Sequence, residues 1–114
     1  MIEIIGSKKY KKVYLSGPIT GKPNLNIDEF QKYEDKFKEL NFEVVNPHKL
    51  HTEEETKRFG WHEFMRRDIK AMCDCDFVAV LNDWEKSKGA NLEVYMARNV
   101  EMPIICAVTL KELF

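Results

Sequence analysis

The chain has 114 residues, and its 18 Lys and Arg residues nearly balance 19 Asp and Glu residues, for a formal net charge of −1. This length suits one compact domain, here residues 1–114, and its hydrophobic content of 44% is enough for one ordinary core. The balanced charge argues against a nucleic-acid-binding protein, which normally carries a basic excess. No apolar run approaches the roughly 18 residues of a membrane span, so we expect neither nucleic acid nor membrane as a partner.

The three cysteines, Cys73, Cys75 and Cys106, are odd in number and fit no disulfide or CxxC pattern. Together with an N-terminus that lacks an apolar signal region, they predict a reducing, cytoplasmic setting. His48 and His51 have no cysteine or carboxylate partner at metal spacing, so we expect surface or loop histidines and no metal site.

Strands and helices alternate along the chain. The expected strands are residues 13–16, 42–45, 77–81 and 103–108. The expected helices, recognised by apolar residues that recur every three or four positions, cover residues 27–40, 61–72 and 87–100. Residues 48–60 are polar and charged, and we expect a loop there.

This alternation predicts an α/β fold, a single three-layer flavodoxin-like or Rossmann-like domain with a mainly parallel sheet of four to five strands. Such sheets bind ligands beyond the carboxyl ends of the strands, where the strand order reverses. We therefore look for a site in the segments that follow Leu15, Val45, Leu81 and Val108.

The segment after the first strand is a candidate anion-binding loop. It reads Ser16-Gly17-Pro18-Ile19-Thr20-Gly21. Its two glycines let backbone amides approach a ligand, and Ser16 and Thr20 add hydroxyl groups. The loop is not GxGxxG and lacks the Lys-Ser/Thr ending of a P-loop, which argues against nicotinamide and ATP. A plain strand-to-helix turn is the alternative.

Glu93 is predicted to point its carboxylate into the protein, because it lies three residues after Ala90 and four before Ala97 on the apolar helix face. A buried carboxylate is costly unless it is used, and the nearby helix N-terminus favours the ionised form that suits a nucleophile or general base. Just upstream, Ser87 and Gly89 offer a hydroxyl and free amides to an anion. The alternative is a solvated Glu93 on the helix flank.

Asp68 repeats this pattern one helix earlier, four residues after Phe64 and four before Met72. A pair of inward carboxylates is what glycosidic-bond cleavage requires: one attacks or stabilises the anomeric carbon, and the other handles the proton of the leaving group. The alternative is that Asp68 binds Arg66, Arg67 or a backbone amide.

Two aromatic residues are candidates for the same site. Tyr14 alternates with its strand neighbours, so its ring can face the site and hydrogen-bond Glu93; core packing is the alternative. Trp84 follows the third strand and is a candidate for stacking on a base, with an exposed loop aromatic as the alternative.

Three segments together resemble the nucleoside 2-deoxyribosyltransferase-like superfamily. They are residues 13–21 (VYLSGPITG), Asp68 ahead of residues 75–80 (CDFVAV), and residues 87–93 (SKGANLE). The resemblance runs from about Lys12 to Cys106 and looks closest to a short branch often met in bacteriophages and bacteria. It is also similar to the deoxynucleoside 5′-monophosphate N-glycosidases.

The resemblance implies that Glu93 attacks C1′ of a 2′-deoxyribonucleotide, that Asp68 protonates or orients the base, and that Tyr14 positions Glu93. It places Ser87 and Gly89 at the 5′ end of the substrate. Enzymes of this kind for free nucleosides tend to carry an aspartate at the position of Ser87. A serine here accepts a 5′-phosphate that an aspartate would repel, so the implied substrate is a 5′-monophosphate.

The sequence therefore predicts an enzyme without cofactor that cleaves the N-glycosidic bond of a 2′-deoxynucleoside 5′-monophosphate, located in the cytoplasm of a cell or of a phage host. The alternatives are a non-catalytic nucleotide-binding or host-interaction protein, and a glycosidase for another N-ribosyl nucleotide. Family members often complete the pocket with a polar group near a neighbouring subunit's C-terminus, for which we find no match here. Because the domain is small, we expect a shallow notch closed by a second subunit, in a homodimer or larger homo-oligomer.

Overall fold

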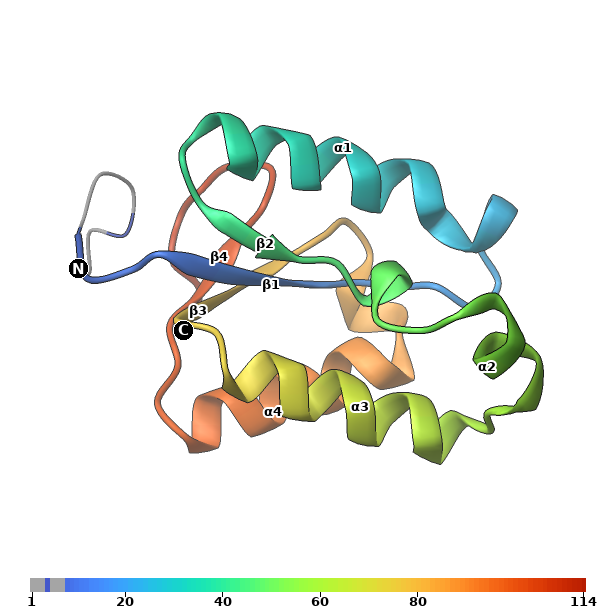
Figure 1. The fold of residues 1–114 in the computed structure, drawn as a ribbon. Coiled ribbons are helices and arrows are strands. Elements are labelled where there is room, and N and C mark those ends of the chain that lie inside the picture. Colours follow the sequence, from blue (N-terminus) through green and yellow to red (C-terminus); the bar gives the residue numbers. More distant parts are fainter. Residues whose placement is uncertain (1–3, 5–7) are drawn as a thin grey trace.

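A parallel β-sheet forms the middle layer of the structure, a computed structural model that describes residue 4 and residues 8–114 (Figure 1). Within these residues the sheet has four strands, in the order β2-β1-β3-β4, and each neighbouring pair is parallel. The strands are β1 (Lys12–Ser16), β2 (Glu43–Val45), β3 (Phe77–Val80) and β4 (Ile104–Cys106). The strand order reverses between β1 and β3, which is where a ligand is expected.

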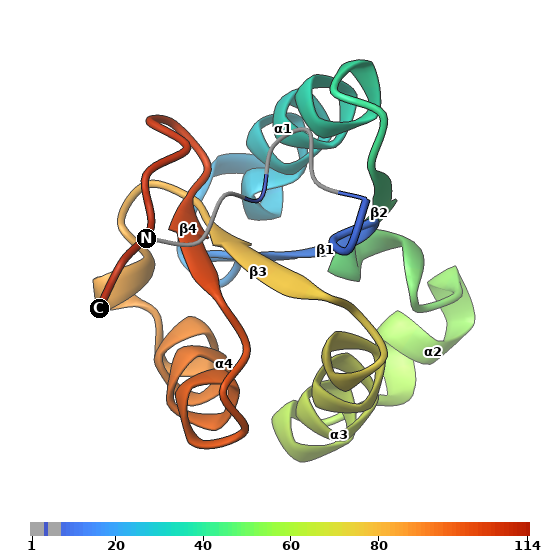
Figure 2. The ribbon, with the colours of Figure 1, turned by 90° about the vertical axis from the view of Figure 1, so that its left-hand side faces the viewer.

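Helices cover both faces of the sheet. The α-helices are α1 (Ile27–Glu39), α2 (Glu53–Arg58), α3 (Trp61–Cys73) and α4 (Lys88–Asn99). Short 3-10 helices are η1 (Pro23–Asn26), η2 (Pro47–Lys49) and η3 (Trp84–Lys86). Figure 2 shows α1 on one face and α3 with α4 on the other, which confirms the predicted three-layer Rossmann-like fold. None of the helices in the described part of the chain is both long and apolar enough to span a membrane.

The side chains of β1 alternate between two separate cores, as the two-residue period of a strand requires. Val13 and Leu15 pack in the cluster that contains Phe30 and Phe37 of α1. Tyr14 packs in the cluster on the opposite face, with residues of α3 and α4. The hydroxyl groups of Tyr14 and Ser16 therefore both reach the α4 side of the sheet.

The expectation of a loop over residues 48–60 is wrong, because η2 and α2 occupy much of it. Helix α2 begins with a capping box: Thr52 Oγ1 accepts from Glu55 N at 3.0 Å, and Glu55 Oε1 accepts from Thr52 N at 2.9 Å. These two bonds satisfy backbone and side-chain groups that a short exposed helix would otherwise leave to water. The helix expected over residues 87–100 ends at Asn99, and Val100 beyond it is 55% exposed.

A buried carboxylate attaches α1 to the segment that follows β2. Glu34 is 2% exposed and accepts hydrogen bonds from Lys38 Nζ at 2.7 Å, Lys49 Nζ at 2.8 Å and Asn46 Nδ2 at 3.2 Å. Burial raises the pKa of Glu34, but the three hydrogen bonds outweigh it and lower the pKa to about 2. These bonds fix the start of the segment that carries His48 and His51.

We predict that Glu34→Ala lowers the free energy of unfolding by about 2 kcal/mol at pH 7, because Asn46 loses a buried acceptor and α1 loses its link to the β2 end. Since folding lowers the pKa of Glu34 from 4.5 to about 2, this stabilisation is present at neutral pH and is lost as the pH falls toward 2. Urea denaturation measures it, with the exposed Glu39→Ala on the same helix as control. Equal midpoints for the two variants would contradict the assignment.

Candidate active site

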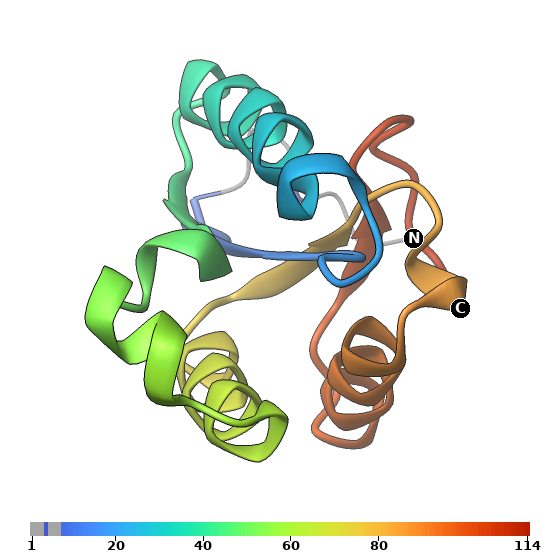
Figure 3. The ribbon, with the colours of Figure 1, turned by 90° about the vertical axis from the view of Figure 1, so that its right-hand side faces the viewer.

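A cavity of about 540 Å³ lies at the carboxyl ends of β1 and β3, within the usual size range of small-molecule sites. Its wall comes from the loop after β1, the segment between β2 and α3, and the first turns of α3 and α4. Figure 3 looks onto this end of the sheet. The segment after Val108, where the sequence also suggests looking for a site, adds no residue to the cavity wall. Residues 47–56 of this chain form one wall of the cavity. The chain therefore supplies part of the enclosure that we expect from a second subunit.

Glu93 of α4 is held by two hydroxyl groups of β1. Tyr14 Oη donates to Glu93 Oε2 at 2.6 Å, and Ser16 Oγ donates to Oε1 at 2.7 Å. Glu93 is 5% exposed and lines the cavity, while Tyr14 and Ser16 are fully buried behind it. The inward direction of Glu93 and its bond to Tyr14 are as predicted, and the solvated alternative is excluded.

The carboxyl of Glu93 has a pKa close to neutral pH. Burial raises the pKa of Glu93 to about 7, the hydrogen bonds from Tyr14 and Ser16 oppose this rise, and the charge of Asp68 adds to it. Burial and the charge of Glu93 raise the pKa of Tyr14 well above its ordinary value, so Tyr14 remains a hydrogen-bond donor. A carboxylate with both oxygens bound in this way is fixed in direction and still exchanges its proton near pH 7.

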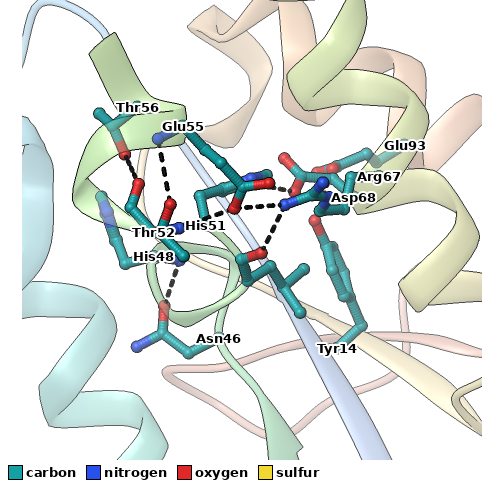
Figure 4. A network of polar contacts seen from close by, with 11 residues as sticks. Tyr14, Asn46, His48, His51, Thr52, Glu55, Thr56, Arg67, Asp68 and Glu93 are labelled. Carbon is teal, nitrogen blue, oxygen red and sulfur yellow. Dashed lines mark hydrogen bonds and ion pairs between the residues drawn. The ribbon is translucent and has the colours of Figure 1, made fainter. Parts of the chain in front are cut away.

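Asp68 of α3 contacts a histidine rather than an arginine. Its Oδ1 lies 3.0 Å from His51 Nε2 (Figure 4). Burial raises the pKa of Asp68 to about 7, and Arg67 opposes this rise. Arg67 itself donates to Glu55 Oε1 at 2.8 Å and to the Leu50 carbonyl at 3.2 Å. The expected alternative of an Arg66 or Arg67 partner for Asp68 is therefore wrong.

His51 is the site residue that the sequence analysis does not find, because the sequence predicts only a surface or loop histidine there. Its side chain is only 7% exposed, and its ring stands edge-on to Phe59 and Phe64, with centroids 5.9 and 4.8 Å apart. His48 also lines the cavity, edge-on to Phe30 at 4.9 Å. Their place just after the carboxyl end of β2 was the available signal, since that position belongs to the ligand side of a parallel sheet.

The N-terminus of α4 forms the part of the wall predicted to hold an anion. Ser87 is the N-cap, and its Oγ accepts from Ala90 N at 3.1 Å, which leaves its own hydrogen available for donation. Ser87 and Gly89 both line the cavity, together with Lys86 and Lys88. A Cβ on Gly89 would lie 3.2 Å from Met65 Sδ, so this side of the wall is closely packed.

The loop after β1 contributes some of its predicted residues to the cavity wall. Gly17 and Ile19 line the cavity. A Cβ on Gly17 would lie 2.8 Å from Leu81 Cβ, which excludes any larger residue without a shift of the strand end. Pro18 and Gly21 do not line it: the Pro18 carbonyl accepts from Asn26, and Gly21 turns the chain with φ +85°.

The tryptophan at the cavity is Trp61 rather than Trp84. Trp61, at the start of α3, is 37% exposed and lines the cavity, and Lys88 Nζ lies 4.1 Å from the centroid of its ring. Trp84 packs against Phe114, with ring centroids 6.2 Å apart, and lies outside the cavity wall. Both tryptophans start a helical segment after a loop, so only their position in space separates them.

Residues 11–106 match the model of a family described as a domain of unknown function, DUF4406. The chain belongs to the DUF4406 family. A search of curated proteins gives no match. The DUF4406 range includes Tyr14, His51, Asp68 and Glu93, so the whole site lies within the family's domain. Within residue 4 and residues 8–114, no three His, Cys, Asp or Glu side chains are grouped to hold a metal ion.

We predict that Glu93→Gln stabilises this DUF4406 domain at high pH. Because folding raises the pKa of Glu93 from 4.5 to about 7, the folded state gains stability from the protonated carboxyl at low pH and loses it as the pH rises through 7. A neutral amide removes that loss, so the free energy of unfolding should rise by about 2 kcal/mol more at pH 8 than at pH 4.5.

Urea denaturation at the two pH values measures this difference, with Glu85→Gln on the exposed surface of η3 as control. If Glu93→Gln changed the free energy of unfolding equally at both pH values, burial would not destabilise the ionised form of Glu93, and the prediction would be wrong.

Proposed function

We propose that this DUF4406 protein cleaves the N-glycosidic bond of a 2′-deoxynucleoside 5′-monophosphate and passes the sugar to water or to another base. The observation that supports this most strongly is the carboxylate of Glu93, which two hydroxyl groups aim into a cavity that a second buried carboxyl, Asp68, also lines. The resemblance of residues 13–21 and 87–93 to nucleoside 2-deoxyribosyltransferases points to the same chemistry.

In the first step, a Glu93 oxygen attacks C1′ of the sugar, and the bond from C1′ to the base nitrogen breaks. Asp68 gives its proton to the departing base and becomes a carboxylate. The donors Tyr14 and Ser16 keep Glu93 in one orientation during the attack, which lowers the entropic cost of reaching the reactive geometry.

In the second step, water or another base attacks C1′ and releases Glu93 as a carboxylate. Asp68, now ionised, accepts the proton of the attacking group and returns to its starting state. Both carboxyls have a pKa of about 7, so each can hold the protonation state its role needs near neutral pH.

The cavity lining offers polar groups for a phosphate and aromatic surface for a base. The free amides at the start of α4, the Ser87 hydroxyl and the ammonium groups of Lys86 and Lys88 favour a phosphate. Phe64 offers aromatic surface on which a base can stack, whereas Lys88 stands 4.1 Å from the centroid of the Trp61 ring. A net charge of −1 is compatible with phosphate binding, because Lys86 and Lys88 line the cavity locally.

The decisive experiment incubates the protein with each deoxynucleoside monophosphate, the parent nucleosides and NAD, and detects released base by chromatography. We expect release from at least one monophosphate and little from nucleosides. Glu93→Gln should reduce kcat by about a thousandfold or more, and Tyr14→Phe by about tenfold, whereas Glu85→Gln should leave it unchanged.

Absence of release from every substrate, or full release by Glu93→Gln, would contradict the proposal. Nucleotide binding without release would favour the non-catalytic alternative, and release from NAD would favour a glycosidase for another N-ribosyl nucleotide. Mass spectrometry of the trapped protein separates a sugar adduct on Glu93 from direct attack by water.

We predict a bell-shaped pH profile of kcat/KM with its maximum near pH 7. Activity falls at low pH as Glu93 is protonated and at high pH as Asp68 loses its proton. Asp68→Asn removes the group that titrates at high pH, so the high-pH limb should disappear while kcat falls. A high-pH limb that persists in Asp68→Asn would show that Asp68 is not the acid.

The homodimer or larger assembly expected from the small size of the domain remains a prediction. Analytical ultracentrifugation measures it directly.

A further inference from the structure

His51 and Asp68 form a polar contact in the cavity wall of which the mechanism above uses only the aspartate. The 3.0 Å between His51 Nε2 and Asp68 Oδ1 is a hydrogen-bond distance, and the two side chains are only 7% and 9% exposed. Such a bond contains one proton between the two atoms. Which atom carries it determines what Asp68 can offer to a ligand.

The surroundings of the His51 ring place that proton on Nε2. The other ring nitrogen, Nδ1, is buried and has no hydrogen-bond partner among the described residues, so a hydrogen there would be an unsatisfied buried donor. Phe59 and Phe64 contact the ring edge-on and give it no further polar partner. A neutral imidazole with its hydrogen on Nε2 donates to Asp68 and leaves only a lone pair on Nδ1.

The charges around the ring keep it neutral. Burial lowers the pKa of His51, and Arg67 of α3 lowers it further, while Glu55 of α2 opposes them. Arg67 and Glu55 bind each other at 2.8 Å, so their effects on the ring partly cancel. His48 of η2 also faces the ring and has a pKa lowered by burial, so it too is neutral at pH 7.

Asp68 has one carboxyl oxygen left for a ligand. Its Oδ1 is occupied by His51, and no other hydrogen bond to the Asp68 carboxyl is formed within residue 4 and residues 8–114. When Nε2–H donates to Oδ1, the proton of a neutral Asp68 resides on Oδ2. An acid with a fixed proton position transfers it with less reorganisation than one whose proton moves between two oxygens.

We infer that His51 is a positioning residue: its Nε2–H donates to Oδ1 of Asp68, holds the acid proton on Oδ2, and stabilises the carboxylate once that proton has left. This inference rests on the proposed function, in which the proton on Oδ2 goes to the departing base. The proton balance is complete, because the base gains the proton that Asp68 loses and His51 stays neutral with its own hydrogen throughout.

The first test does not depend on activity. Nitrogen-15 NMR of the imidazole should show neutral His51 with its hydrogen on Nε2 at pH 7. Carbon-13 NMR of the Asp68 carboxyl should show a titration midpoint that rises by about one pH unit in His51→Phe, because the ionised form loses a donor. His51→Gln, whose amide N–H can replace Nε2–H, should keep the midpoint of the wild type.

An imidazolium or a hydrogen on Nδ1 at pH 7, or an Asp68 midpoint unchanged by His51→Phe, would overturn the inference. His62→Phe, an exposed histidine outside the cavity wall, is the matched control. If His51→Phe does not fold, the nitrogen-15 spectrum of the wild type still decides the position of the hydrogen.

The second test uses base release. His51→Phe should lower kcat/KM at pH 7 about tenfold and move the high-pH limb upward by about one unit, and His51→Gln should restore both. A merely structural role would lower activity without moving the limb, and that result would also overturn the inference. If the wild type releases no base at all, the proposed function fails, while the NMR test still decides whether His51 orients Asp68.

Discussion

The site depends on one buried contact, in which two hydroxyl groups of β1 hold the carboxylate of Glu93. Tyr14 and Ser16 lie two residues apart on a central strand, so both face α4, and their hydroxyls meet the two oxygens of Glu93 at 2.6 and 2.7 Å. Burial makes ionised Glu93 costly, and the two donors offset part of that cost. A carboxyl whose pKa is about 7 is the result, and it lies in the wall of the cavity.

The segment between β2 and α3 forms another part of the cavity wall, and it is attached to the rest of the protein at two points. Glu34 binds the start of this segment through Asn46 and Lys49. Arg67 binds its far part through Glu55 and the Leu50 carbonyl, and its guanidinium also lies 4.8 Å from the centroid of the Phe59 ring. His51 lies between these two attachments, so its position against Asp68 follows from contacts made by its neighbours.

Much of the fold and the centre of the site could be predicted because they depend on short-range periodicity. The four-residue spacing of apolar positions around Asp68 and Glu93 places both on inner helix faces, and the alternation in β1 places Tyr14 with them. The capping box of Thr52 and Glu55 is also visible in the sequence, although the polar character of residues 48–60 predicts a loop. Only two residues form this capping signal. The stretch around them has no regular spacing of apolar residues, which is the stronger indication of a helix.

The amino-acid sequence by itself therefore determined the α/β layers, the strand ends at which the cavity lies, and the inward carboxylates, because each follows from residues close together in the chain. Only the tertiary structure decided that His51 rather than an arginine contacts Asp68, and that Trp61 rather than Trp84 lines the cavity. His51 and Asp68 are 17 residues apart, and they meet because β2, α2 and α3 pack in one particular arrangement. Contacts of that kind arise from packing between elements, and no local pattern in the sequence specifies them.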